Sequence, residues 1–328
     1  MRTFAEKLYA QKLDGKHFKT NAYRCIPIAV STSLLCIAIA FFIKDANSKV
    51  FTQEVVYADA KSSNGQIEVK FRIDRTLEAP VYFYYHLKNL TMNHRRMQQS
   101  FCPQQLFGRN SNECIDFYPF RRTHYCNTSI QCDPTPSKVV NFITKLELPT
   151  CVDNCTHYYA PMGARANLFF NDTFELSDDN RGPVLWSSEN IVPPRELQKY
   201  GNPGGRTKNL CDHEYFKNTV KALNWQQHIC ELGGYTNPDF IIWMMPVAYK
   251  NFKKIYRILE HGFLPAGDYT LTVNNRWFNG GEKSILIMKP SWMGSKNIFL
   301  EYSFLIVGLF FGFVSMTFLF FRVDMKLQ

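Results

Sequence analysis

Residues 25–43 read CIPIAVSTSLLCIAIAFFI, and residues 302–321 read YSFLIVGLFFGFVSMTFLFF. Neither run contains Asp, Glu, Lys or Arg. A helix rises about 1.5 Å per residue, so each run forms a helix of roughly 30 Å, the thickness of the hydrocarbon core of a bilayer. The sequence therefore predicts membrane-spanning helices over residues 25–43 and 298–321, with a domain over residues 44–297 between them.

The first run could instead be a cleavable signal peptide, because Ala38-Ile39-Ala40 resembles a cleavage site. This tripeptide lies inside the apolar run, however, and residues 1–24 are long for the basic region of a signal peptide. We therefore predict an uncleaved membrane anchor.

Basic residues flank both runs on the side of the chain ends. Residues 1–24 contain two acidic residues and six basic ones, which are Arg2, Lys7, Lys12, Lys16, Lys19 and Arg24. Arg322 and Lys326 follow the second run. Such flanks stay in the cytosol. We therefore expect cytosolic tails over residues 1–24 and 322–328, and a lumenal or extracellular domain, in a multi-pass protein of the endoplasmic reticulum, the Golgi or endosomes, or the plasma membrane.

Asn-x-Ser/Thr acceptors for N-linked glycans lie only in this middle segment, at Asn89, Asn127, Asn154 and Asn171. The same segment holds eight of the ten cysteines, which are Cys102, Cys114, Cys126, Cys132, Cys151, Cys155, Cys211 and Cys230. An even number in an oxidising compartment indicates up to four disulfides. Cys211 with Cys230 is the first choice of pair, and the pairing of the other six stays open. Their spacing lacks the paired Cys-x-x-Cys knuckles of a zinc site.

Period-two alternation indicates strands at both ends of the domain. Residues 66–74 alternate apolar with charged residues, and an aromatic run over 81–87 follows a turn at 77–80. Residues 268–274 and 283–289 flank a turn-rich NGGE segment and predict a hairpin.

A helix is predicted over residues 246–261, with Pro246 in its first turn and Gly262 as its stop. Lys253 and Lys254 are placed on its solvated face. The predicted fold class is therefore two transmembrane α-helices flanking a mostly-β (α+β), disulfide-stapled exterior domain built on antiparallel sheets.

No motif for catalysis is visible. The chain lacks a phosphate-binding loop, a Gly-x-Ser-x-Gly elbow, a His-Glu-x-x-His helix and an Asp-x-Asp pair. The middle segment is only modestly basic, which argues against a nucleic-acid partner. We therefore predict a chain that is not an enzyme, with no catalytic residues, no metal and no cofactor apart from N-linked glycans.

Several segments resemble one known family, in order along the chain. They are VYFYYHLKNLTMNHRRMQQS (81–100), GARANLFFNDTFEL (163–176), VLWSSENI (184–191), NPGG (202–205), NPDFIIWMM (237–245), FKKIYRILE (252–260), LPAGDYTLTV (264–273) and KPSWMGSKNIFL (289–300). Together they resemble the cell cycle control protein 50 family, also called the ligand-effect modulator family. Its members are accessory (beta) subunits of type IV P-type ATPases, the phospholipid flippases.

The resemblance implies glycans on Asn171 and Asn89. It also implies an architectural role for the NHRR segment, in which Arg95 and Arg96 would be buried or capping ion-pair partners. Met162 stands where many members of the family have a cysteine, so family disulfides are not transferred to this chain.

The resemblance implies a heterodimer with an ATPase catalytic subunit, in contact with membrane lipids. Such a subunit would support folding of the ATPase, its export from the endoplasmic reticulum, and phospholipid movement to the cytosolic leaflet. Small residues at Gly308, Gly312 and Ser315 would let the helices approach the ATPase bundle closely. Alternatives are a two-pass ligand-gated channel, a lumenal enzyme with one anchor, and an accessory subunit of an ATPase-like domain fused to another enzyme.

Overall fold

The computed structural model describes residues 22–59, 65–109, 124–125, 157–204, 209–217, 219–221, 225–277 and 281–327. The chain divides into two compact units. The first, here called the helix unit, comprises Met1–Val50 and Pro290–Gln328. The second, here called the β-domain, comprises Phe51–Lys289.

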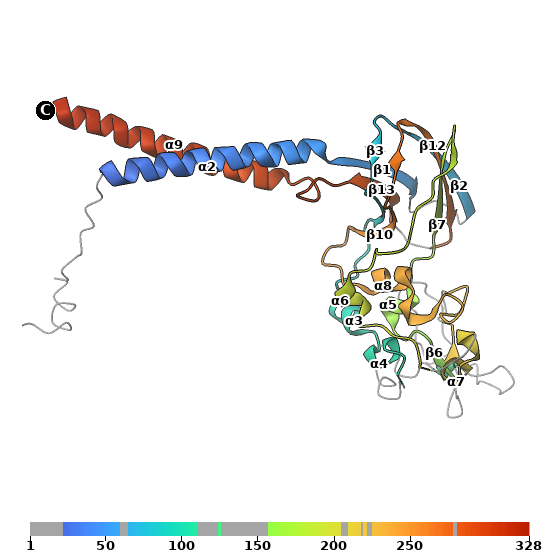
Figure 1. Ribbon diagram of the computed structural model, residues 1–328. Coiled ribbons are helices and arrows are strands. Elements are labelled where there is room, and N and C mark those ends of the chain that lie inside the picture. Colours follow the sequence, from blue (N-terminus) through green and yellow to red (C-terminus); the bar gives the residue numbers. More distant parts are fainter. Residues whose placement is uncertain are drawn as a thin grey trace, which may run out of the picture. The chain divides into compact units, whose positions relative to one another are not determined.

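The helix unit consists of two long helices, α2 (Ala22–Lys49) and α9 (Ile298–Leu327). They pack against each other along their length, as the blue and red helices of Figure 1 show. Cys25–Lys49 and Ile298–Phe320 are long and apolar enough to cross a membrane. Each helix continues past the apolar run that predicted it, because nothing in the sequence breaks it there.

The β-domain contains two four-stranded antiparallel sheets. One sheet has the order β1 (Phe51–Ala58), β13 (Lys283–Lys289), β4 (Val81–Leu87) and β10 (Phe252–Leu259). The other has the order β2 (Gly65–Ile73), β12 (Gly267–Asn275), β7 (Thr173–Asp178) and β8 (Gly182–Pro183).

The two sheets pack face to face around an aromatic core (Figure 1). Tyr57 of β1 and Tyr256 of β10 both meet the ring of Phe174 of β7 edge-on, with ring centroids 5.3 and 5.0 Å apart. Strand β4 supplies Phe83 and Tyr85 to the same core, alternating with half-buried neighbours. Period-two alternation therefore sets which face of each strand is buried.

Short elements connect the sheets and build the rest of the domain. The helices are α3 (Arg95–Gln99), α4 (Pro103–Leu106), α5 (Ala164–Asn167), α6 (Pro194–Leu197), α7 (Glu214–Lys217) and α8 (Pro238–Met244). Two single 3-10 turns cover Leu210–Asp212 and Gly234–Thr236. The remaining strands are β3 (Leu77–Glu78), β5 (His124–Tyr125), β6 (His157–Tyr159), β9 (Thr219–Val220) and β11 (Phe263–Leu264).

The predicted fold class is confirmed, because two terminal apolar helices flank a mostly-β domain with antiparallel sheets and a disulfide. Strands are present over 66–74 and 81–87 as predicted, although β2 and β4 belong to different sheets.

Two predictions about the later strands are wrong. The segments 268–274 and 283–289 are strands β12 and β13, but they do not form a hairpin: β12 pairs with β2 and β7, and β13 with β1 and β4. The predicted helix over 246–261 is wrong too, because residues 252–259 form strand β10. Its buried residues Phe252, Lys254, Tyr256 and Ile258 follow a period of two, hidden in the sequence by the lysine.

Candidate functional site

A narrow seam joins α2 to α9. Seven buried residues of α2 recur at alternating spacings of three and four, and these are Ile26, Ala29, Ser33, Cys36, Ala40, Ile43 and Asn47. This is the heptad pattern of a helix that keeps one face against an antiparallel or parallel partner helix. Ala46, next to Asn47, is buried as well. On α9 the buried positions include Gly308 and Ser315. The outward faces of both helices remain apolar and exposed, and thus free for lipid or for another membrane protein.

Gly308 allows the closest approach in this seam. A Cβ on Gly308 would lie 2.7 Å from Cγ1 of Ile37 and 3.2 Å from its backbone nitrogen. Ser33 uses the space to donate a hydrogen bond from Oγ to the carbonyl of Gly308, at 2.7 Å. The small residues predicted to meet an ATPase bundle are therefore used for contact within the chain.

Polar side chains connect the C-terminal end of α2 to the N-terminal end of α9. Asn47 donates from Nδ2 to Oε2 of Glu301 at 2.8 Å and to the carbonyl of Asn297 at 3.2 Å. The backbone nitrogen of Asn297 donates back to Oδ1 of Asn47 at 3.0 Å. These bonds fix the register of the two helices without placing a bare charge in the apolar runs.

Gly308→Leu should force the seam apart, because overpacking a close contact costs about 1–3 kcal/mol. In denaturant unfolding of the full chain in detergent micelles, we expect Gly308→Leu to lower the free energy of unfolding by about this amount relative to the parent. Val307→Leu, on the exposed face, is the matched control and should change that free energy by less than about 0.5 kcal/mol. Equal losses for the two variants would contradict a close contact at Gly308.

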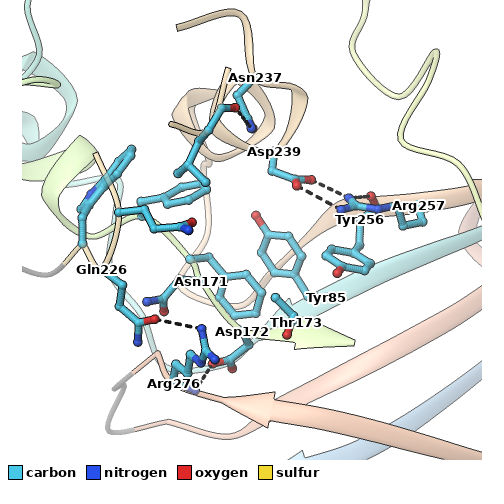
Figure 2. A pocket seen from close by; sticks show the side chains of 15 residues that line it. Tyr85, Asn171, Asp172, Thr173, Gln226, Asn237, Asp239, Tyr256, Arg257 and Arg276 are labelled. Atoms are coloured by element: carbon cyan, nitrogen blue, oxygen red, sulfur yellow. Dashed lines mark hydrogen bonds and ion pairs between the residues drawn. The ribbon is translucent and has the colours of Figure 1, made fainter. Parts of the chain in front are cut away.

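A pocket of about 180 Å³ opens in the β-domain beside the segment Asn171-Asp172-Thr173 (Figure 2). Its other walls include Tyr85, Phe169, Trp225, Asp239, Arg257 and Arg276. Both guanidinium groups are already paired. Arg257 makes a two-pronged ion pair with Asp239, at 2.6 and 3.1 Å, and Arg276 donates to Oε1 of Gln226 at 2.8 Å. Both guanidinium groups therefore already have partners, a carboxylate for Arg257 and an amide oxygen for Arg276.

The side-chain oxygens of Asn171 and Asp172 differ in their hydrogen bonds. The Oδ1 atom of Asn171 is buried and has no hydrogen-bond partner among the described residues, while its side chain lies at the pocket (Figure 2). Asp172 is fully buried and accepts four hydrogen bonds. Its donors are the backbone nitrogens of Arg276 (2.7 Å) and Trp277 (2.6 Å), the Tyr57 hydroxyl (2.9 Å) and Nζ of Lys283 (2.7 Å).

Lys283 completes this buried cluster. Its ammonium also donates to the Trp277 carbonyl at 2.6 Å and to Oδ1 of Asn275. Burial lowers the pKa of Lys283, and the Asp172 carboxylate opposes that shift. Burial and the same carboxylate raise the pKa of Tyr57 well above its ordinary value. The cluster ties β1 and β13 to the acceptor segment, and sequence patterning alone gave no sign of it.

Two further buried cations hold the end of α8. Lys254 donates to the carbonyls of Ile242 (2.5 Å), Trp243 (2.6 Å) and Met245 (2.7 Å). Arg165 donates to the carbonyl of Met244 at 2.9 Å. Desolvation lowers the pKa of Lys254 to about 7, with a smaller contribution from Arg165. These carbonyls would otherwise end a helix without partners inside the domain.

Comparison with known proteins matches residues 11–327 to the model of one family, described as LEM3 (ligand-effect modulator 3) family / CDC50 family. The chain belongs to the CDC50 family. The match takes in both apolar helices and the whole β-domain. It therefore confirms the resemblance found in the sequence.

Individual relatives agree with this assignment. The chain is 32% identical over 263 residues to Cell cycle control protein 50A of Rattus norvegicus, covering 71% of this chain and 69% of that protein. It is 28% identical over 276 residues to Cell cycle control protein 50B of Homo sapiens, covering 75% and 68%. It is 24% identical over 274 residues to the Putative ALA-interacting subunit 2 of Arabidopsis thaliana, covering 78% and 65%. For Cell cycle control protein 50A of Mus musculus and Bos taurus, the matches cover 64% and 63% of the relative, just under two thirds.

The predicted site residues of this CDC50-family chain are scattered rather than gathered. Cys211 and Cys230 form a disulfide with Cα atoms 5.0 Å apart, and Cys102 is also disulfide-bonded. Asn89 is exposed and lies in the left-handed backbone region, with φ of 60°. The other predicted site residues lie outside the described part of the chain, and these are Cys114, Cys126, Cys132, Cys151, Cys155, Asn127 and Asn154.

Arg95 is not buried, because it is exposed at the start of α3. Asn93 is the anchor instead, since its Nδ2 donates to the carbonyl of Ala248 at 2.7 Å. Within the described ranges, no three His, Cys, Asp or Glu side chains are grouped so that they could hold a metal ion.

Proposed function

We propose that this CDC50-family chain is the non-catalytic accessory subunit of a type IV P-type ATPase that moves phospholipid to the cytosolic leaflet. It would form a heterodimer with the catalytic subunit, and support its folding and its export from the endoplasmic reticulum. The observation that carries the proposal is the family match, which extends from residue 11 to residue 327 and so includes both helices and the β-domain.

The arrangement of polar groups agrees with this role. In the β-domain pocket Arg257 is paired with Asp239 and Arg276 with the Gln226 amide, and the Asp172 and Lys283 cluster is fully buried. Buried, satisfied networks of this kind fix one rigid conformation rather than perform chemistry. The small residues of α9 contact α2 within the same chain. The outward faces of both helices carry bulky apolar side chains, against which a partner bundle and lipid can pack.

Isolating the full chain from its native membrane and identifying what co-purifies tests the proposal. We expect a P-type ATPase in about equal amounts with the chain. Depleting the chain should lower both phosphoenzyme formation by that ATPase and its delivery out of the endoplasmic reticulum. Equal phosphoenzyme and equal delivery with and without the chain would overturn the proposal, and a homotrimer in detergent would favour the channel alternative.

We also propose that both chain ends are cytosolic and that the β-domain is lumenal or extracellular, carrying N-linked glycans. The basic flanks of the apolar runs and the oxidised Cys211–Cys230 pair support this orientation. The membrane could be that of the endoplasmic reticulum, the Golgi or endosomes, or the plasma membrane.

Asn89 and Asn171 should differ in how their glycans are reached. Asn89 is exposed, whereas Asn171 precedes a fully buried residue and has a buried Oδ1 atom. A glycan on Asn171 would start beside the pocket walls, and we expect it to be harder to reach than one on Asn89. On the folded full chain, we expect a peptide N-glycosidase to remove the Asn89 glycan readily, and the Asn171 glycan only after denaturation.

Gel mobility of Asn89→Gln and Asn171→Gln variants, before and after denaturation, measures this difference. Each variant should migrate faster than the parent by the mass of one glycan. If neither variant changes mobility, these two acceptors are unused. Release of the Asn171 glycan from the folded protein would contradict the burial argument.

A further inference from the structure

A tight turn precedes α9 in the helix unit. The backbone nitrogens and carbonyls of Ser291 and Gly294 bond to each other in both directions, at 3.0 and 2.9 Å. Oγ of Ser291 also accepts a hydrogen bond from the backbone nitrogen of Met293 at 3.3 Å. Gly294 has φ of +93°, which favours glycine. The turn is thus closed by its own backbone and holds Trp292 at its tip.

Trp292 is 76% exposed, although it is the largest kind of apolar side chain. The four other tryptophans, at positions 186, 225, 243 and 277, are buried or half-buried in the β-domain. The turn holds this large aromatic side chain in water, so the favourable free energy of burying its apolar surface is not gained.

The turn lies close to where the second apolar run begins. Helix α9 starts at Ile298, and the uncharged run starts at Tyr302, about one helical turn later. The bonded polar group of Asn47, Asn297 and Glu301 lies at this same end of the helix pair. Trp292 lies six positions before Ile298, a reach of at most about 20 Å. Trp292 is therefore within reach of the headgroup layer of the leaflet on the β-domain's side of the membrane.

Neighbouring side chains suit the same layer. Phe299, in the first turn of α9, is 81% exposed, and Lys296 is exposed between it and Trp292. A tryptophan, whose ring is apolar and whose N–H is polar, is favoured at the boundary between water and lipid, and a lysine beside it can meet lipid phosphate.

We propose that the turn Ser291–Gly294 is a bilayer anchor, in which Trp292 inserts into the phospholipid headgroup layer on the side of the membrane that carries the β-domain. The anchor would stop α9 from sliding along the membrane normal. It rests on the two apolar helices crossing the membrane, and it does not depend on the ATPase partner or on which side is cytosolic.

Fluorescence quenching of the full chain in phosphatidylcholine vesicles tests this proposal. The emission of Trp292 is obtained as the parent spectrum minus that of Trp292→Phe. We expect phosphatidylcholine brominated near the ester carbonyls to remove most of this emission, and phosphatidylcholine brominated near the chain ends to remove much less. The water-soluble quencher acrylamide should have little effect on it.

Trp186→Phe is the matched control, because Trp186 packs between Phe83 and Tyr256 inside the β-domain. The emission lost in that variant should not respond to brominated lipid. If acrylamide quenches Trp292 and brominated lipid does not, the residue faces water and the proposal fails. If neither quencher acts, Trp292 is covered by protein, such as a second copy of the chain, and the proposal fails as well.

Discussion

Asp172→Asn is expected to lower the free energy of unfolding by about 3–5 kcal/mol, because it leaves a buried ammonium without its counter-charge. The single oxygen of the new amide can still accept from the backbone nitrogens of Arg276 and Trp277. The amide nitrogen would then face the Lys283 ammonium and the Tyr57 hydroxyl, which are donors. Denaturant unfolding of the full chain in detergent micelles, followed by tryptophan fluorescence, measures the loss.

Two further variants separate this effect from a general loss of packing. Glu175→Gln, on the exposed side of β7, removes a carboxylate without breaking a buried pair and should change stability by less than about 0.5 kcal/mol. Asp172→Asn combined with Lys283→Met removes the unpaired charge, so the double variant should be less destabilised than the sum of its single variants. Strict additivity would show that the ion pair is not the source of the loss. Asp172→Asn keeps the glycan acceptor pattern of Asn171 intact in both the single and the double variant.

Lys254→Met is expected to cost about 2–3 kcal/mol at neutral pH, since it removes the donor to three buried carbonyls at the end of α8. The adjacent Lys253→Met is a matched control, because Lys253 is on the exposed side of β10 and lies over the ring of Tyr84. Its loss should cost well under half as much. Equal losses for the two lysines would contradict the role assigned to Lys254.

The pH dependence of stability gives an independent test of Lys254. Its pKa is about 7 in the folded chain and about 10.4 in an unfolded chain. Between these values the unfolded state binds more protons than the folded state, so the contribution of Lys254 to stability increases as the pH rises from 7 toward 10. The neutral amine keeps two donor hydrogens for the carbonyls. We expect the parent to gain stability relative to Lys254→Met between pH 7 and pH 9, and a constant difference would contradict the lowered pKa.

Local patterns predicted the elements that bury one face by simple alternation. Strands β2 and β4 follow from residues 66–74 and 81–87, because their inward side chains are apolar and period-two spacing is visible. Strand β10 was mistaken for a helix because its inward position 254 is a lysine. Once Lys254 is counted as polar, the remaining apolar residues of that segment fit a helical face. Buried Lys254 finds its hydrogen-bond acceptors at the end of α8. That helix is close in space, but no repeating pattern in the sequence connects it to Lys254.

Strand partners were beyond local reasoning for a related reason. Residues 268–274 and 283–289 are close in sequence, which favours a hairpin, yet β12 and β13 pair with strands from distant parts of the chain. The partner of Gly308 in α9 could not be predicted from local sequence either. Gly308 was predicted to be a close-contact position, which it is, but its neighbour is Ile37 of the same chain.

The sequence by itself determined what depends on composition over a continuous stretch: the two apolar helices, the strands with visible alternation, the acceptor tripeptides, and the family. The helices and strands follow from transfer free energy and local periodicity, and the tripeptides and the family from the order of the residues, none of which needs knowledge of spatial neighbours. Only the tertiary structure decided the pairing of strands, the α2–α9 seam, and the burial of Asp172, Lys254 and Lys283. A charged residue can be buried only when distant groups supply its hydrogen bonds, and those groups meet it only in the folded chain.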